Sequence, residues 1–288
     1  VMYTYAWYHW LTFFYVYCFF GWIFESTYVS LKQRHFVNRG FLRLPMLPLY
    51  GTGAVMMLWV SLPVRNSLIA VYFSGLIGAT VLEYITGWAM ERLFKVRYWD
   101  YSNQKFNLHG YICLTSSIAW GFLTILMTEV IHPPIAKAVL EIKPHTECFF
   151  LITTTILFGY DTFQSTKEAL DLARALESIT KLRAELEDMQ VQIALLRAET
   201  VQEIHRIKEN VRDSVVESAE LRHENINLKK EEFETRIQEL SKQLNEKRDV
   251  LKTRIGKRTP AILRRNPGAI SRRFASALKE LRSTIENL

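Results

Sequence analysis

The chain has 288 residues, of which 49% are hydrophobic and 23% are charged, with a formal net charge of +7. Its mean hydropathy of +0.01 conceals two different halves: residues 1–165 are mostly apolar and aromatic, whereas residues 166–288 are rich in charge and contain no Trp or Tyr. This contrast excludes a single water-soluble domain of uniform character. The three cysteines, Cys18, Cys113 and Cys148, are far apart in the sequence, so we expect no disulfide framework, metal or cofactor.

Five apolar segments are long enough to cross a membrane as helices. They predict an all-α fold, with a five-helix transmembrane bundle over residues 1–165 and spans at about 6–31, 46–62, 67–94, 111–131 and 147–166. The first segment lacks a basic leader and a small-residue cleavage site, so we expect a span rather than a cleaved signal peptide. The second is short and contains Pro48, Gly51 and Gly53, so a broken or re-entrant helix is an alternative there.

Basic residues are concentrated in the first and third connections between these spans. By the positive-inside rule these two connections are cytoplasmic. An odd number of spans then places the N-terminus outside and everything after Thr166 in the cytoplasm. The basic residues are Lys32, Arg34, Arg39 and Arg43 in the first connection, and Arg92, Lys95, Arg97 and Lys105 in the third.

Carboxylates interrupt the predicted spans. Glu83 and Glu91 are eight positions apart with Gly87 midway, so all three lie on one helix face. Counting from Lys95, Glu83 lies roughly 18 Å into the hydrocarbon. An ionised carboxylate there costs at least about 2.5 to 3.5 kcal/mol unless a partner or water meets it.

Because Glu25 also approaches the inner membrane face, the acids and the cytoplasmic connections predict one polar cavity that opens inward. The alternative is that each acid is a structural lock between helices, beside a belt of interfacial aromatic residues. The candidate cavity residues are Glu25, Asn38, Arg39, Arg43, Tyr50, Glu83, Glu91, Trp99, Asp100, Tyr101, Asn107 and His109.

Four motifs follow one another in residues 5–165: GWIFE at 21–25, NRGFLRLPMLPLYGTGA at 38–54, EYITGWAMERLF at 83–94, and WDYSNQKFNLHGYICL at 99–114. This stretch resembles the CmpB-like family of bacterial membrane proteins, usually labelled ABC-transporter permeases, which has vertebrate multi-span relatives. The resemblance implies a compact five-helix domain in a bacterial plasma membrane. The family's motif positions are occupied by Glu25, Asn38, Arg39, Gly40, Pro48, Tyr50, Gly51, Glu83, Glu91, Trp99, Asp100, Tyr101, Ser102, Asn107 and Gly110.

The chain also departs from that pattern. It has Arg43, Leu44 and Pro45 where the family usually has a Gly-Pro pair, and Tyr111 where the family often has Arg. Neither a permease coupling loop nor a phosphate-binding GxxxxGK[ST] motif is present.

Residues 166–255 predict a long cytoplasmic coiled coil. No Pro or Gly occurs between Gly159 and Gly256, and apolar residues recur at spacings of three and four. Such a seam predicts a homo-oligomer, with a homodimer as the first choice. The polar stretch at 214–230 is either a weak point in a straight rod or the turn of an antiparallel hairpin.

Residues 256–288 form a basic tail in which 269–288 predict an amphipathic helix. A polybasic stretch attracts anionic lipid or nucleic acid, but no base-recognition motif is present, so we do not expect nucleic-acid binding. The candidate polyanion-binding residues are Lys257, Arg258, Arg264, Arg265, Arg272 and Arg273.

Three functions are compatible with this pattern. The first is a membrane protein that binds or passes a small polar or ionic solute through the acidic cavity. The second is a membrane-anchored scaffold whose rod and basic tail recruit a cytoplasmic partner or anionic lipid. The third is an intramembrane enzyme acting on lipid headgroups through Glu25, Glu83, Asp100 and His109. Since no nucleophile or metal motif supports the third, we do not expect an enzyme.

Overall fold

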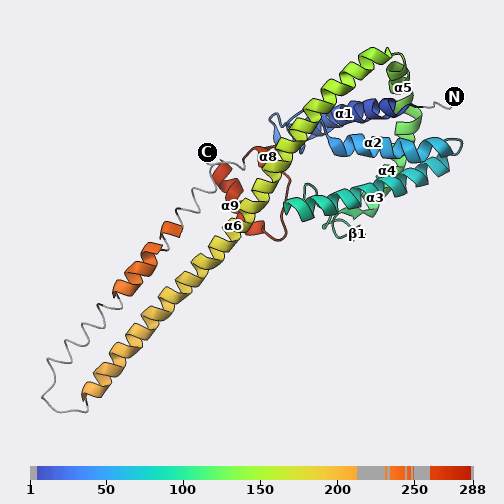
Figure 1. Ribbon diagram of the computed structural model, residues 1–288. Helices are drawn as coiled ribbons and strands as arrows, with labels where there is room; N and C mark the ends of the chain where they lie inside the picture. The colour runs from blue at the N-terminus through green and yellow to red at the C-terminus, as the bar shows by residue number, and fades with distance from the viewer. Residues whose placement is uncertain are drawn as a thin grey trace. The chain divides into compact units, whose positions relative to one another are not determined.

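The computed structural model describes residues 5–212, 231, 234–243, 245–247, 249 and 260–286 (Figure 1). Almost all regular structure in these ranges is helical, which confirms the predicted all-α class. The elements are α1 (Trp7–Gln33), α2 (Pro48–Ser61), the 3-10 turn η1 (Leu62–Val64), α3 (Leu68–Phe94), β1 (Asn107–Leu108), β2 (Ile112–Cys113), α4 (Leu114–Leu126), the π-helical turn η2 (Met127–Ile131), α5 (His132–Leu140), α6 (Pro144–Arg212), α8 (Pro260–Arg265) and α9 (Ala275–Glu286).

The chain divides into two compact units. The first comprises Val1–Ala173 with Arg258–Arg282, and the second comprises Arg174–Lys257 with Ser283–Leu288. In the first unit α1 packs on α2, α2 on α3 and α3 on α4, and α1, α2 and α3 are seen side by side in Figure 1. The hydrophobic core of these helices includes Phe13, Tyr17, Leu58, Met127 and Val139.

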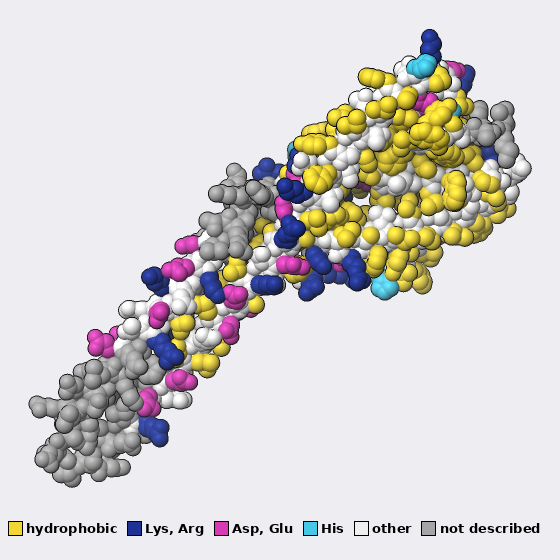
Figure 2. All heavy atoms as spheres, in the orientation of Figure 1, with side chains coloured by type: hydrophobic (Ala, Val, Ile, Leu, Met, Phe, Trp, Pro, Cys, Tyr) yellow, Lys and Arg dark blue, Asp and Glu magenta, His cyan; other side chains and the backbone are white. Residues whose placement is uncertain are grey.

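Helix α3 has its small residues inside and its large apolar residues outside. The buried stripe repeats every four residues and consists of Val71, Gly75, Ala79, Glu83 and Gly87. The opposite stripe is exposed and consists of Ile69, Phe73, Ile77, Val81 and Ile85. Figure 2 shows the result, a surface of the first unit that is covered largely by hydrophobic side chains. This arrangement is typical of helices whose outer face meets lipid.

Two helices in the described ranges are both long and apolar enough to cross a membrane, Leu68–Phe94 and Leu114–Leu140, and a shorter apolar helix covers Pro48–Val64. The first predicted span forms α1, which has the length, but its many Tyr and Trp side chains and its polar residues reduce its hydropathy. The predicted span at 147–166 is the beginning of α6, which continues to Arg212 without interruption.

The fourth predicted span ends at residue 131, whereas the helix continues to Leu140. Pro133 and Pro134 lie in the first turn of α5, where the N–H that proline lacks has little consequence. The π-helical turn at Met127–Ile131 absorbs the change in hydrogen bonding ahead of them.

In the second unit, residues 236–243 and 247 lie beside α6 and run in the opposite direction. Lys247 Nζ lies 2.5 Å from Glu185 Oε2, and a groove of about 430 Å³ lies between 192–199 of α6 and 236–243. Residues later in α6 thus lie opposite residues earlier in the second segment, so the two segments are antiparallel. This favours the hairpin over the straight rod. The predicted turn at 214–230 lies outside the described residues.

Candidate functional site

The first unit contains a cavity of about 470 Å³ at the end of the helices where α1 and α3 finish and α2 and α4 begin. Helices α1, α2, α3 and α4, the loops after α1 and α3, and the C-terminal segment all contribute to it. Its lining comprises Glu25, Arg39, Gly40, Phe41, Leu47, Pro48, Leu49, Tyr50, Thr52, Leu82, Glu83, Thr86, Met90, Tyr98, Trp99, Tyr101, Trp120 and Asn266.

Glu25 is the half-exposed acid of this cavity. It accepts a 2.8 Å hydrogen bond from the Tyr50 hydroxyl, and Arg39 Nε lies 3.6 Å from its other oxygen. Tyr50 can approach because α1 has glycine at position 21, where an added Cβ would lie 2.3 Å from the Tyr50 Cβ. Glu25 is therefore neutralised by one cation.

Glu83 is the buried acid, with 5% of its surface exposed. One carboxylate oxygen accepts from the Tyr101 hydroxyl at 3.0 Å, and the other accepts from Trp120 Nε1 at 2.8 Å and from the Ser116 hydroxyl at 3.4 Å. All three donors are neutral. Within the described residues, no ion pair to Glu83 is formed.

Arg39 is held at the cavity by the C-terminal segment, residues 260–282. Its Nη1 donates to Asn266 Oδ1 at 2.6 Å and its Nη2 to the Tyr98 carbonyl at 3.3 Å. Asn266 is 2% exposed and donates in turn to the Gly40 carbonyl at 3.0 Å. An amide more than 220 positions away in the sequence thus completes the wall of the cavity.

Sequence comparison places this geometry in a family. Residues 12–166, more than half of the chain, match the family described as "Putative ABC-transporter type IV". The chain belongs to this family. The match confirms the predicted CmpB-like resemblance, and the family label suggests a membrane protein of the ABC-transporter type. No curated protein and no solved structure matches the chain.

Of the twelve predicted site residues in the family domain, six line the cavity: Glu25, Arg39, Tyr50, Glu83, Trp99 and Tyr101. Asn38, Arg43, Glu91, Asp100, Asn107 and His109 lie outside this lining. The six residues outside the lining make contacts that hold the loops after α1 and α3 in place, as described below.

Glu91 and Asp100 both contact one buried arginine. Arg97 is 6% exposed, and its Nε lies 2.7 Å from Glu91 and its Nη1 3.3 Å from Asp100. Its guanidinium also donates to the His109 carbonyl at 2.8 Å and lies 4.6 Å from the centre of the Tyr111 ring. The acid that shares a helix face with Glu83 is therefore paired in the loop instead of facing the cavity.

The loop after α1 is fixed by hydrogen bonds to a buried acid of α6. Asp161 accepts from the backbone N–H groups of Arg43 and Leu44 at 2.9 and 2.8 Å. Asn38 accepts from Trp22 Nε1 at 2.6 Å and donates to the Arg43 carbonyl at 2.7 Å. These contacts hold Arg39 in position.

Asn107 and His109 belong to the loop after α3. The Asn107 side chain accepts from the Gly110 N–H at 3.1 Å, and His109 Nδ1 lies 3.2 Å from the Tyr84 hydroxyl. Gly110 has φ +77° and no room for a Cβ beside Asp100 and Ser102, so only glycine suits this turn.

Most of the cavity lining was not predicted from the sequence, and two polar lining residues, Trp120 and Asn266, are the main omissions, together with Ser116, which contacts Glu83. Trp120 and Ser116, its neighbour beside Glu83, lie on α4 near the small buried residues Ser117 and Gly121, a pattern that marks a packed face in membrane helices. Asn266 gave no such signal, since nothing in a basic tail indicates that one amide will be buried. Glu147, at the start of the fifth predicted span, is also buried and accepts from the Thr12 hydroxyl at 2.6 Å, and it was not among the predicted site residues.

The C-terminal segment packs against the family domain, and its basic residues take part. Arg97 and Ile270 exchange two backbone hydrogen bonds of 2.7 and 2.9 Å. Arg265 donates to Glu168 at 2.8 Å, and Arg272 contacts Ser102 and Asp100. The apolar side chains that this segment buries are Ile262, Leu263, Phe274, Leu278 and Leu281.

Two of the predicted polyanion-binding residues, Arg265 and Arg272, are thus paired within the first unit, while Arg264 and Arg273 are exposed. Lys257 and Arg258 lie outside the described residues. The predicted amphipathic helix at 269–288 is shorter than expected, because α9 begins at Ala275 after the extended stretch that pairs with Arg97.

Acid should loosen the C-terminal segment. Partial burial alone would raise the pKa of Glu168, but hydrogen bonds from Arg43 and Arg265 outweigh it and lower the pKa. Burial would also raise the pKa of Asp100, but the hydrogen bonds from Ser102 and the positive charge of Arg272 outweigh it, so the pKa of Asp100 is lowered. Groups with a lowered folded pKa stabilise the fold above their unfolded pKa, and this stability is lost as the pH falls through the folded pKa.

We therefore expect the thermal midpoint in detergent to fall as the pH is lowered below about 4.5, and to fall less in a Glu168→Gln/Asp100→Asn double variant. The matched control is Glu187→Gln, an exposed acid of α6 that contacts only Arg183 among the described ion pairs. Equal acid sensitivity of wild type and double variant would contradict the assignment.

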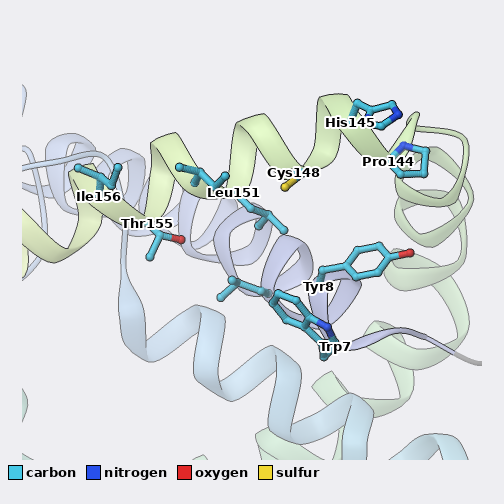
Figure 3. A pocket seen from close by; sticks show the side chains of 10 residues that line it. Trp7, Tyr8, Pro144, His145, Cys148, Leu151, Thr155 and Ile156 are labelled. Carbon is cyan, nitrogen blue, oxygen red and sulfur yellow. The ribbon is translucent and has the colours of Figure 1, made fainter.

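A second and larger hollow, of about 580 Å³, lies between α1 and the first turns of α6. Figure 3 shows Trp7 and Tyr8 of α1 facing Cys148, Leu151 and other side chains of α6. Its lining contains no Asp, Glu, Lys or Arg. This hollow offers no charge with which to select a polar solute.

Proposed function

We propose that the chain is an integral membrane protein that binds or passes a small polar or ionic solute through the cavity at Glu25 and Glu83. The observation that supports this is that two predicted intramembrane acids from different helices line one cavity. Structural locks alone would leave each acid sealed separately. Pockets of this volume, with mostly apolar walls and a few polar groups, are typical of small-molecule sites.

The proposal includes five spans, with the N-terminus outside and the cavity near the cytoplasmic face. The exposed apolar stripe of α3 and the exposed aromatic side chains of α1 and α6 support it, since such surfaces are stable in lipid. The basic residues of the loops after α1 and α3 support the orientation. We place the protein in a bacterial plasma membrane, with Arg264 and Arg273 available to anionic lipid.

The second unit supports a further role in assembly. We propose that its helices form a coiled coil that sets a homo-oligomer, with a homodimer as the first choice. The alternative is that this unit recruits a cytoplasmic partner, as in a membrane-anchored scaffold.

The test of solute passage is a flux measurement in liposomes with the purified full chain. We expect proton, Na⁺ or K⁺ flux that falls at least about tenfold in Glu83→Gln, because that change removes a charge while keeping the side-chain shape. Glu141→Gln, an exposed acid outside the cavity, is the matched control. Flux that is absent, or equal in wild type and Glu83→Gln, would contradict passage of these ions and favour the scaffold.

A further inference from the structure

The chemical character of the cavity indicates which solute it accepts. Its ionisable lining, aside from tyrosines, consists of Glu25, Glu83 and Arg39, a formal sum of −1. Arg39 is already committed to Glu25, to Asn266 and to the Tyr98 carbonyl. The excess negative charge therefore lies at Glu83.

The donors around Glu83 suit the ionised carboxylate. Tyr101 donates to one oxygen, and Trp120 and Ser116 donate to the other. Trp120 Nε1 can only donate, so it pairs with a lone pair. Hydrogen bonds of this kind favour the charged form of an acid, whereas burial disfavours it. A cationic solute beside Glu83 would offset the cost of burying the charge.

Aromatic side chains make up much of the remaining wall: Phe41, Tyr50, Tyr98, Trp99, Tyr101 and Trp120. The polar atoms of several are tied down, since Trp120 and Tyr101 donate to Glu83 and Trp99 Nε1 donates to the Tyr111 carbonyl at 3.0 Å. Fixed aromatic rings attract cations through their negative faces, and they do so best for ammonium groups with alkyl substituents.

A tightly coordinated metal ion, as distinct from an ion that only passes through, fits the same cavity poorly. The described residues contain no cluster of three or more His, Cys, Asp or Glu that would hold a metal. Hard cations prefer six or more oxygen ligands, whereas this wall is mostly apolar. A volume of about 470 Å³ also exceeds what one dehydrated ion would fill.

We infer that the cavity binds a small organic ammonium cation, with its charge beside Glu83 and its alkyl groups against Trp99, Tyr101 and Trp120. The inference rests on the proposed function and names its solute class. Glu25 and Arg39 form a neutral pair in the same lining, and Glu25 accepts the hydrogen bond of Tyr50.

Isothermal titration calorimetry of the full chain in lipid nanodiscs tests this with two matched probes. Choline carries a trimethylammonium group, and 3,3-dimethylbutan-1-ol has the same shape without the charge. We expect choline to bind at least about tenfold more tightly than the alcohol. Glu83→Gln should remove this preference, whereas Glu129→Gln, which lies at Arg65 outside the cavity lining, should keep it.

Trp99→Leu tests the aromatic contribution, because Trp99 Nε1 donates to the Tyr111 carbonyl and not to Glu83. We expect weaker choline binding, and an unchanged thermal midpoint would show that the variant is folded. Equal affinity for choline and the alcohol, or choline binding unaffected by Glu83→Gln, would overturn the ammonium inference. If Glu83-dependent flux of inorganic ions persists in that case, the proposed function stands and only the solute class is wrong. If neither flux nor binding depends on Glu83, both are wrong.

Discussion

Arg97→Ala should lower the free energy of unfolding by about 3 kcal/mol, the cost expected for breaking a buried ion pair by removing one partner. The guanidinium is 6% exposed and contacts two acids, one carbonyl and one ring, so its removal leaves Glu91 and Asp100 without their nearest cation. Denaturant or thermal unfolding in detergent, followed by circular dichroism, measures the change.

The matched control is Lys105→Ala, an exposed cation of the same loop, which should change stability by less than about 0.5 kcal/mol. Arg97→Ala/Glu91→Gln should recover part of the loss, because the stranded carboxylate is then neutral. A loss no larger than that of Lys105→Ala would show that the Arg97 contacts contribute little to the fold.

Gly75→Ala should destabilise the helix pair α3–α4 by about 2 to 3 kcal/mol. An added Cβ would lie 2.0 to 2.4 Å from three side-chain atoms of Thr124. Thr124 has no exposed surface, and its hydroxyl donates to the Trp120 carbonyl at 2.8 Å, so it cannot turn away without cost. The helices would have to separate, which would also shift Trp120 relative to Glu83.

Gly78→Ala provides the control on the same helix. Its added Cβ would meet Val60 at 3.5 Å, which is ordinary contact, and alanine is the better helix former by up to about 1 kcal/mol. We expect Gly78→Ala to be neutral or stabilising in the same unfolding assay. Equal effects of the two substitutions would indicate that α3 and α4 do not approach at Gly75.

Local patterns in the sequence were sufficient for much of the fold. Helix positions follow from apolar length and from the absence of Pro and Gly, both of which act within a few turns. This rule has exceptions in the structure. Gly159 lies inside α6, and Pro133 and Pro134 lie in the first turn of α5, so neither Gly nor Pro ends a helix at these positions. The two-residue strands at Asn107–Leu108 and Ile112–Cys113 were not predicted, because so short a pairing has no periodicity.

The candidate site was predicted in part. Glu25 and Glu83 are recognisable because charged groups are costly inside apolar segments, and Arg39 is recognisable as one of the basic residues of the connection that follows the first span. The sequence predicted that Glu91 lies in the same cavity, since it shares a helix face with Glu83. In the structure the chain turns after α3 and places Arg97 Nε 2.7 Å from the Glu91 carboxylate, so Glu91 is paired with Arg97 instead. Helix periodicity specifies a face, and it does not specify which loop covers that face.

The sequence by itself determined the all-α class, the family, the two acids that a membrane segment would not otherwise contain, and the arginine of the connection after the first span. Tertiary structure alone decided that Asn266 and Trp120 complete the cavity wall, that the basic segment 260–282 docks on the family domain, and that α6 has an antiparallel neighbour in the second unit. The physical reason is the distance along the chain over which each effect acts. Burial costs and helix periodicity act between near neighbours in the chain, whereas the partner of a buried polar group is chosen by whichever distant segment the packing brings within hydrogen-bond distance.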